Sequence, residues 1–184
     1  MKPKLLLLSI VLALQTAWVL GTVAVQERAL FHGEVILLET RPVDPRDLLR
    51  GDYVILNYAI STIPVSAFAG ERAIAVPAGE TVYVLLEKRG DYHQIVQAST
   101  KPLRAGPQQV MLKGVSRSWL DNARSQQPTL VEYGLERYYV SEGTGNPTGK
   151  LTVQVAVPAS GQGVIKQVFV DGVPYAKALK QQEE

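Results

Sequence analysis

Apolar positions follow one pattern at the start of the chain and another in the remainder. The first is an uninterrupted apolar run from Leu5 to Val25 without a charged residue. As a helix this run is about 31 Å long, which matches a hydrocarbon core of about 30 Å. Lys2 and Lys4 precede it, and by the positive-inside rule they keep the N-terminus in the cytoplasm and send the body outside. We expect residues 1–25 to be a signal anchor that crosses the cytoplasmic membrane once.

A cleaved secretory signal is the alternative interpretation of this run. Such a signal usually has an apolar region of about 7 to 15 residues and ends at a small-x-small cleavage site. Thr22-Val23-Ala24 is a weak site of this kind, and the run is longer than a signal requires. Both interpretations export the same body to the periplasmic side. The length of the run favours the uncleaved anchor, followed by a short stalk over residues 26–33.

Beyond residue 33 the pattern changes to short apolar runs rich in Val, Ile, Leu and Tyr, which are separated by Gly, Pro, Asp and Asn. This pattern is typical of strands and turns. The recurrence at roughly ten-residue spacing predicts an all-β domain over residues 34–175, either a sandwich or a barrel-like fold. The polar tail, residues 176–184, is expected to fray. The expected strands are Glu34–Thr40, Tyr53–Ser61, Thr81–Lys88, Tyr92–Ala98, Gln109–Gly114, Thr129–Val140, Lys150–Val157 and Val164–Val170.

Turn residues add three local predictions. Gly90-Asp91 lies between two of the expected strands and predicts a tight hairpin. The segment Ser160–Gly163 predicts a second hairpin before the last strand. Between residues 118 and 127 the pattern fits either a short helix or a loop, which Pro128 ends.

Charge and cysteine content narrow the classes of function. Of the 19 Lys and Arg residues, Lys2 and Lys4 precede the apolar run, so the remaining basic residues balance the 17 acidic ones. A neutral body without a basic stripe argues against nucleic-acid binding. The chain has no cysteine, which excludes disulfides, thiolate metal sites and a cysteine nucleophile. We expect no cofactor.

Two segments carry the most specific sequence signal. The first is GDYVILNY at Gly51–Tyr58, and the second is EYGLERYYVSEGTG at Glu132–Gly145. Together they resemble the signature segments of the GDYXXLXY family, a group of uncharacterised bacterial membrane-anchored proteins. Ser141 stands where the resemblance leads us to expect proline. The family carries no known activity. Because its genes tend to lie beside that of a multi-pass membrane protein, the resemblance implies such a protein as a partner.

The residues of these segments also have physical roles that do not depend on the family. Gly51 allows an abrupt turn, and Asp52 can accept hydrogen bonds from the amides of that turn. Strand alternation then divides each segment between two faces. The expected faces are Asp52, Val54, Leu56 and Tyr58 against Tyr53, Ile55 and Asn57 in the first segment, and Arg137 and Tyr139 against Glu136, Tyr138 and Val140 in the second.

Two non-enzymatic hypotheses follow for the motif residues. In the structural one, Arg137 forms a charge-assisted bond with Asp52 or Glu142 and ties the two strands together. In the second, four tyrosines line a groove or patch for a partner, and Arg137 and Asp52 provide orientation. These tyrosines are Tyr53, Tyr58, Tyr138 and Tyr139.

Catalysis and metal binding have weaker support. A peptidase of the signal-peptidase type would need a serine before the Gly-Asp, and none lies between Glu34 and Arg50. An envelope hydrolase could use Asp52 with Glu136 or Glu142 as a carboxylate pair. His32 and His93 are the only histidines and have no metal-ligand spacing. We therefore expect a non-enzymatic accessory or interaction subunit of a cell-envelope membrane protein. The alternatives are the hydrolase and a glycan- or small-ligand-binding module.

Overall fold

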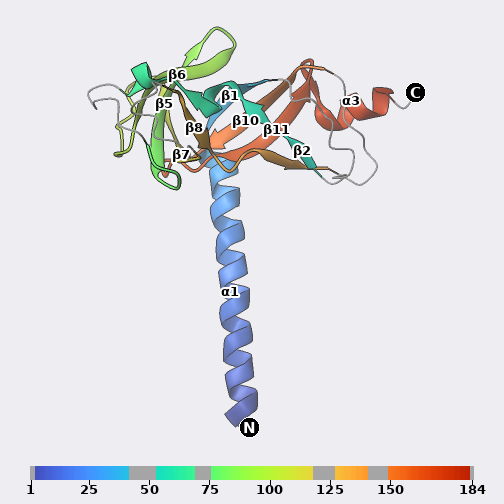
Figure 1. Cartoon of the computed structure of the whole chain (residues 1–184). Helices are drawn as coiled ribbons and strands as arrows, with labels where there is room; N and C mark the ends of the chain where they lie inside the picture. The colour runs from blue at the N-terminus through green and yellow to red at the C-terminus, as the bar shows by residue number, and fades with distance from the viewer. Residues whose placement is uncertain (1–2, 42–52, 69–75, 118–126, 141–148, 183–184) are drawn as a thin grey trace.

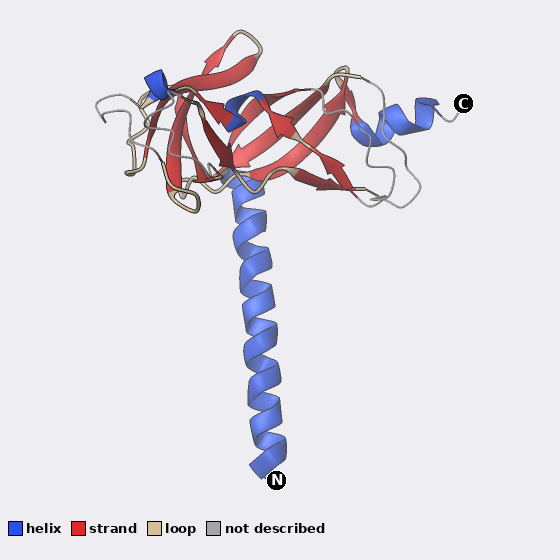
Figure 2. Ribbon diagram, viewed as in Figure 1, coloured by secondary structure: helices blue, strands red, loops and turns tan. Residues whose placement is uncertain are grey.

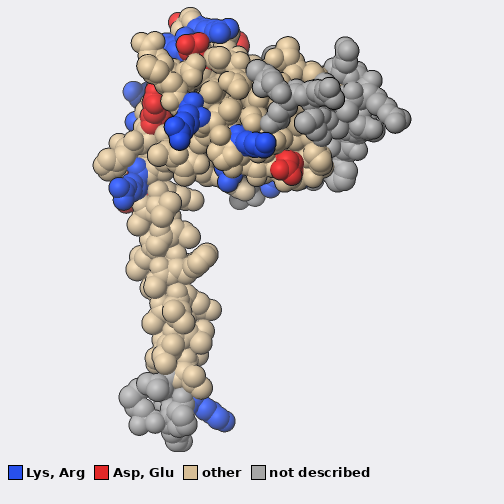
Figure 3. Space-filling view, turned by 90° about the vertical axis from the view of Figure 1, so that its left-hand side faces the viewer, with Lys and Arg blue, Asp and Glu red and all other residues tan. Residues whose placement is uncertain are grey.

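A long N-terminal helix carries a β-rich body at its C-terminal end in the computed structural model (Figure 1). The structure describes residues 3–41, 53–68, 76–117, 127–140 and 149–182. Helix α1, Pro3–His32, contains a stretch from Leu7 to His32 that is long and apolar enough to cross a membrane. Most of its large apolar side chains are exposed, and the charged side chains in Figure 3 gather mainly on the body.

The body consists mainly of strands (Figure 2). The strands are β1 (Glu34–Arg41), β2 (Tyr53–Ile55), β3 (Asn57–Tyr58), β4 (Thr62–Ile63), β5 (Thr81–Arg89), β6 (Tyr92–Ser99), β7 (Gln109–Ser116), β8 (Thr129–Glu132), β9 (Arg137–Tyr139), β10 (Leu151–Val157), β11 (Val164–Val170) and β12 (Val173–Pro174). Short 3-10 helices occupy Ala59–Ser61 and Val65–Ala67, and helix α3, Tyr175–Gln182, ends the described chain.

Three antiparallel sheets organise these strands. The first has the order β12-β11-β10-β1-β3, the second has the order β4-β8-β7-β5-β6, and β2 pairs with β9 in a two-stranded ladder. Among the described residues these sheets stay open and do not close a barrel. The expected all-β domain after an apolar helix is therefore confirmed, as are the hairpins at Gly90-Asp91 and between β10 and β11.

One hydrophobic core joins the two larger sheets. On β1, Ile36 and Leu38 are fully buried, and their two-residue spacing places both on the inner face. Val84 and Leu86 alternate in the same way on β5, and all four side chains belong to one cluster. Burial of such aliphatic side chains stabilises a fold by about 1.5–3 kcal/mol each. The two larger sheets therefore share one interior.

The chain differs from the sequence-based expectations in four places. The expected long strand Thr129–Val140 is broken, because residues 133–136 leave the sheet at a glycine, Gly134, whose φ is +77°. The expected strand Tyr53–Ser61 divides into β2, which pairs with β9, β3, which pairs with β1, and the 3-10 helix Ala59–Ser61. The stalk segment 26–33 continues α1 up to His32. The tail forms α3 instead of fraying, since Tyr175 and Ala178, three residues apart, are both buried against the body.

Candidate functional site

The two motif segments lie side by side. Strands β2 and β9 pair antiparallel, with Tyr53 opposite Tyr139, Val54 opposite Tyr138 and Ile55 opposite Arg137. The ladder continues one residue further, where the backbone N–H of Leu56 donates to the carbonyl of Glu136 at 2.8 Å. Segments separated by about 80 positions in the sequence therefore form one local structure.

The inward face of the first segment is part of the core. Val54, Leu56 and Tyr58 are buried, whereas Ile55 and Asn57 are exposed, so the expected alternation is confirmed for the described positions. The hydroxyl of the fully buried Tyr58 donates to the carbonyl of Leu135 at 2.7 Å. Burial, followed by the nearby Glu136 carboxylate, raises the pKa of Tyr58 far above its ordinary value, so this phenol stays protonated.

A second tyrosine makes the reverse connection. The hydroxyl of Tyr133 donates to the carbonyl of Ile60 at 2.8 Å, and burial raises the pKa of Tyr133 in the same way, with Glu136 as the second cause. A carboxylate oxygen of Glu136 accepts a bond from the backbone N–H of Tyr133 at 2.6 Å, which fixes the turn at Gly134. We call the two hydroxyl bonds from Tyr58 and Tyr133 the reciprocal tyrosine bonds. They fasten the end of the motif to the turn between β8 and β9.

Sequence reasoning did not assign roles to Tyr133 and Leu135 or identify this turn. The available signal was Gly134, because glycine inside a strand pattern often marks a break or a bulge. The partners of the two hydroxyls are backbone carbonyls, which have no residue-specific signature. A pattern search could therefore find the break and not the bonds.

The outward face of the same ladder carries an exposed cluster. The guanidinium carbon of Arg137 lies 5.4 Å from the ring centroid of Tyr53, and the Tyr53 and Tyr139 rings are 6.1 Å apart at an angle of 58°. Tyr139 is 71% exposed and Ile55 is 47% exposed. We call these four residues the aromatic–arginine patch. Cation–π and tilted ring contacts each contribute about 0.5–1.5 kcal/mol, enough to hold the patch in one arrangement.

The four candidate tyrosines do not line one groove. Tyr53 and Tyr139 belong to the patch, and Tyr58 lies in the core. Tyr138 points to the opposite face of the ladder, where its ring meets Tyr175 of α3 edge-on at 5.5 Å. Strand alternation causes this division, because neighbouring residues on β9 face opposite sides.

Three of the candidate site residues lie outside the described part of the chain. They are Gly51, Asp52 and Glu142. The expected bonds from Asp52 or Glu142 to Arg137, and the carboxylate pair of the hydrolase hypothesis, fall on these positions and stay predictions. Glu136, the other carboxylate considered for that pair, is engaged with the backbone of Tyr133.

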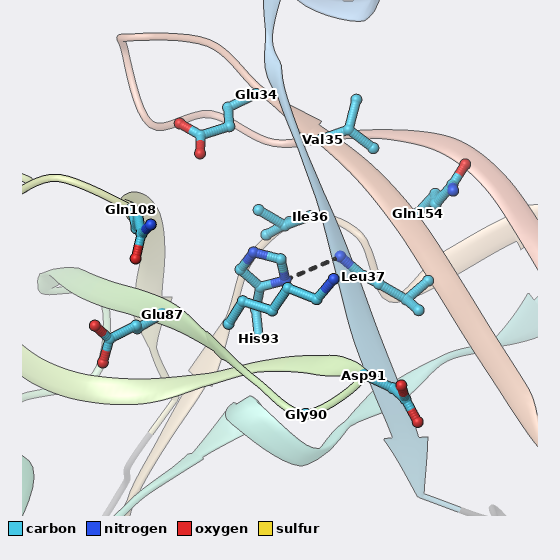
Figure 4. Close-up of a pocket in the computed structure, with 11 residues that line it drawn as sticks. Glu34, Val35, Ile36, Leu37, Glu87, Gly90, Asp91, His93, Gln108 and Gln154 are labelled. Carbon is cyan, nitrogen blue, oxygen red and sulfur yellow. Dashed lines mark hydrogen bonds between the residues drawn. The ribbon is translucent and has the colours of Figure 1, made fainter.

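A surface recess lies between β1 and the β5–β6 hairpin (Figure 4). Its volume is about 730 Å³. The backbone N–H of Leu37 donates to Nδ1 of His93 at 3.2 Å, so the imidazole caps an edge of β1 that faces away from β10. Burial lowers the pKa of His93 below its ordinary value, which favours the neutral ring that this bond requires.

The charged groups of the recess do not converge. Glu34, Glu87 and Asp91 lie at separate parts of the rim in Figure 4, and His93 uses one ring nitrogen to hold β1. The described residues contain no group of three His, Asp or Glu side chains placed to hold a metal ion. This geometry fits a structural joint between the two sheets better than a reaction centre.

The family model of GDYXXLXY proteins matches residues 15–168, a range that includes both motif segments. The chain belongs to the GDYXXLXY family. Comparison with curated proteins and with solved structures returned no match. Three signature positions have a structural role in the described part of this chain. Leu56 and Tyr58 lie in the core, and the hydroxyl of Tyr58 forms one of the reciprocal tyrosine bonds. Tyr53 lies on the other face, under Arg137.

Proposed function

We propose that this GDYXXLXY protein is a single-pass membrane protein that acts as a non-enzymatic accessory subunit of a multi-pass protein of the cell envelope. Its N-terminus lies in the cytoplasm and its body lies on the periplasmic face of the cytoplasmic membrane. The anchor stays uncleaved and holds the body against the bilayer. The aromatic–arginine patch contacts the partner.

The joint between α1 and the body is the observation that carries this proposal. Ala29 is only 5% exposed, although it belongs to the same helix as the apolar run. The N–H of Gly33 donates to the carbonyl of Ala29 at 2.9 Å, and a Cβ at Gly33 would lie 2.9 Å from the backbone nitrogen of Val157 on β10. The helix therefore enters the body through a tight contact and not through a flexible linker.

This joint supports a position of the body close to the membrane surface. From Val25, where the apolar run ends, to Ala29 the helix rises only about 6 Å. That distance keeps the body within reach of the lipid headgroups and of the extracytoplasmic loops of a neighbouring membrane protein. Helical structure also continues through Thr22–Ala24, the candidate cleavage site, without a break. Both features support an uncleaved anchor with a surface-bound body.

The aromatic–arginine patch supports a protein partner. Tyr and Arg are enriched among residues that dominate binding energy at interfaces, where rigid rings provide contact area with little loss of conformational entropy. Here the stacking of Arg137 on Tyr53 holds the patch in place before binding. The patch is formed by residues of β2 and β9, so a partner would meet the family signature directly.

Purification of the tagged full-length chain from native membranes tests the proposal. We expect an intact N-terminus by mass spectrometry and a stoichiometric multi-pass membrane protein in the complex. Tyr139→Ala and Arg137→Ala should each weaken the complex at least tenfold while the chain still folds, because both side chains are exposed.

Arg117→Ala is the matched control, since Arg117 is also exposed and its ion pair with Glu132, at 2.7 Å, lies on another sheet. This control should leave the complex intact. A body recovered as a soluble species trimmed near Ala24 would refute the anchor. A complex that loses equal affinity in the control and the patch variants would refute the role of the patch.

A further inference from the structure

The side chain of Gln15 places an amide at the middle of the apolar run from Leu5 to Val25. The hydroxyls of Thr16 and Thr22 donate within the helix, to the carbonyls of Leu12 at 2.9 Å and Val19 at 2.8 Å. The Gln15 amide is exposed and has no hydrogen-bond partner among the described residues. In hydrocarbon, a polar group without a partner is strongly unfavourable, and transmembrane helices commonly satisfy such amides across a helix–helix contact.

The direction in which the Gln15 side chain leaves α1 follows from its spacing from Ala29, at the joint between α1 and the body. Gln15, Thr22 and Ala29 are seven residues apart, and seven residues of an α-helix return to within about 20° of the same direction. Ala29 is the buried residue of α1 that packs on the body. The amide therefore points toward the lipid below the side of the body that covers Ala29. Val11 and Trp18 extend the same face with the four- and three-residue spacing of a packing seam.

We infer that this face of α1 binds a transmembrane helix of another membrane protein, and that this helix carries a polar side chain at the level of Gln15. The inference rests on the proposed anchoring of α1 in the bilayer. A second copy of this chain fits poorly. Its α1 would have to run beside the first α1 up to His32, and on this face the body of the first copy already covers Ala29. A helix that ends at the membrane surface fits beneath the body.

Site-directed photo-crosslinking in native membranes tests the inference with the full-length chain. Benzoylphenylalanine is introduced singly at Val11 and Trp18 on the predicted face, and at Ala13 and Leu20 on the opposite face. We expect crosslinks from the first pair only. The crosslinked peptide should be a transmembrane segment of another protein with a polar residue near its centre.

Three substitutions distinguish the effect of the Gln15 amide from general effects on the helix. Gln15→Leu should lower the crosslinking yield about three- to thirty-fold, the range expected for an interhelical hydrogen bond in a membrane. It makes the anchor more apolar, so it does not impair insertion. Gln15→Asn keeps an amide and should retain most of the yield. Thr16→Val is the matched control and should change nothing, because that hydroxyl bonds within its own helix.

Every other outcome overturns the inference. Crosslinks to a second copy would replace the partner with a homodimer. Equal crosslinking from all four positions, no crosslinking, or a yield insensitive to Gln15→Leu would remove the specific contact. The mass of the chain in isolated membranes is measured first. A trimmed, soluble chain defeats the proposed function, whereas an intact anchored chain without face-specific crosslinks defeats this inference alone.

Discussion

Replacing Tyr58 with phenylalanine removes one hydroxyl and keeps the ring, so the variant tests one of the reciprocal tyrosine bonds without opening a cavity. The lost donor bonds the carbonyl of Leu135 at 2.7 Å, and Leu135 is only 2% exposed. A buried carbonyl left without its partner costs about 1–3 kcal/mol. At about 2–4 °C per kcal/mol for a chain of this size, the melting temperature should fall by roughly 2–12 °C.

Thermal unfolding of the full-length chain in detergent, followed by circular dichroism of the β signal, measures this change. Tyr83→Phe is the matched control, because the hydroxyl of this half-buried tyrosine has no partner among the described residues. The control should stay within about 0.5 kcal/mol of the parent chain. A Tyr58→Phe shift no larger than the control shift would show that the hydroxyl does not fasten the two segments. In the double variant with Tyr58→Phe and Tyr133→Phe, the losses of stability from the two single substitutions should not add, since both hydroxyl bonds join the same two segments.

Three further predictions concern pH and the helix joint. Burial raises the pKa of Tyr58 and Tyr133, so these phenols ionise only in the unfolded chain once the pH exceeds about 10. Stability should therefore fall above that pH, by up to about 1.4 kcal/mol per pH unit for each tyrosine, in urea titrations from pH 8 to 11.5. Gly33→Val should destabilise the joint by about 1–3 kcal/mol, because the valine side chain would meet backbone atoms of Ala29 and Val157. Trypsin should then cleave faster after the exposed Arg28. Burial lowers the pKa of His93, so its stabilising effect should be present above about pH 6.5 and be lost as the pH falls, as melting curves between pH 7.5 and 5 would detect.

Each of these predictions has a result that would contradict it. Tyr58→Phe and Tyr133→Phe should each remove part of the loss of stability at alkaline pH. If stability falls with pH as steeply in these variants as in the parent chain, the two phenols are not the cause. Gly21→Ala in the same helix should be harmless, since a Cβ there meets nothing within 4 Å, so equal trypsin sensitivity would deny a special role for the joint. His93→Asn should be less sensitive to acid than the parent chain, and equal sensitivity would point to other groups near β1.

Local patterns predicted most of the secondary structure. The expected strands Glu34–Thr40, Thr81–Lys88 and Val164–Val170 agree with β1, β5 and β11 to within a residue at each end. Side-chain alternation and turn residues act over a few positions, and both are visible in the sequence. The same alternation correctly assigned the inner and outer positions of Val54–Tyr58, because one face of a half-buried strand must be apolar.

The candidate site was predicted less completely. The sequence identified Tyr53, Arg137 and Tyr139 as residues worth placing together, and the β2–β9 ladder brings them into contact. It also grouped Tyr58 and Tyr138 with them, although the first lies in the core and the second faces α3. The sequence does not distinguish a tyrosine in a core from one in a helix contact or an interface. Only the neighbouring residues in the folded structure distinguish these roles. The partner role of the aromatic–arginine patch stays a prediction.

The sequence by itself determined an apolar N-terminal helix of membrane-spanning length, a β body and the family to which the chain belongs. These features depend on hydrophobic period, turn residues and motif letters, which are local properties. The tertiary structure alone decided that α1 enters the body without a flexible stalk, that β2 pairs with β9, and that the Tyr58 hydroxyl reaches the carbonyl of Leu135, 77 positions away. Such contacts join segments that come together only when all the sheets pack. The acceptor of the Tyr58 bond is a backbone carbonyl, a group that every residue has, so the sequence does not indicate it.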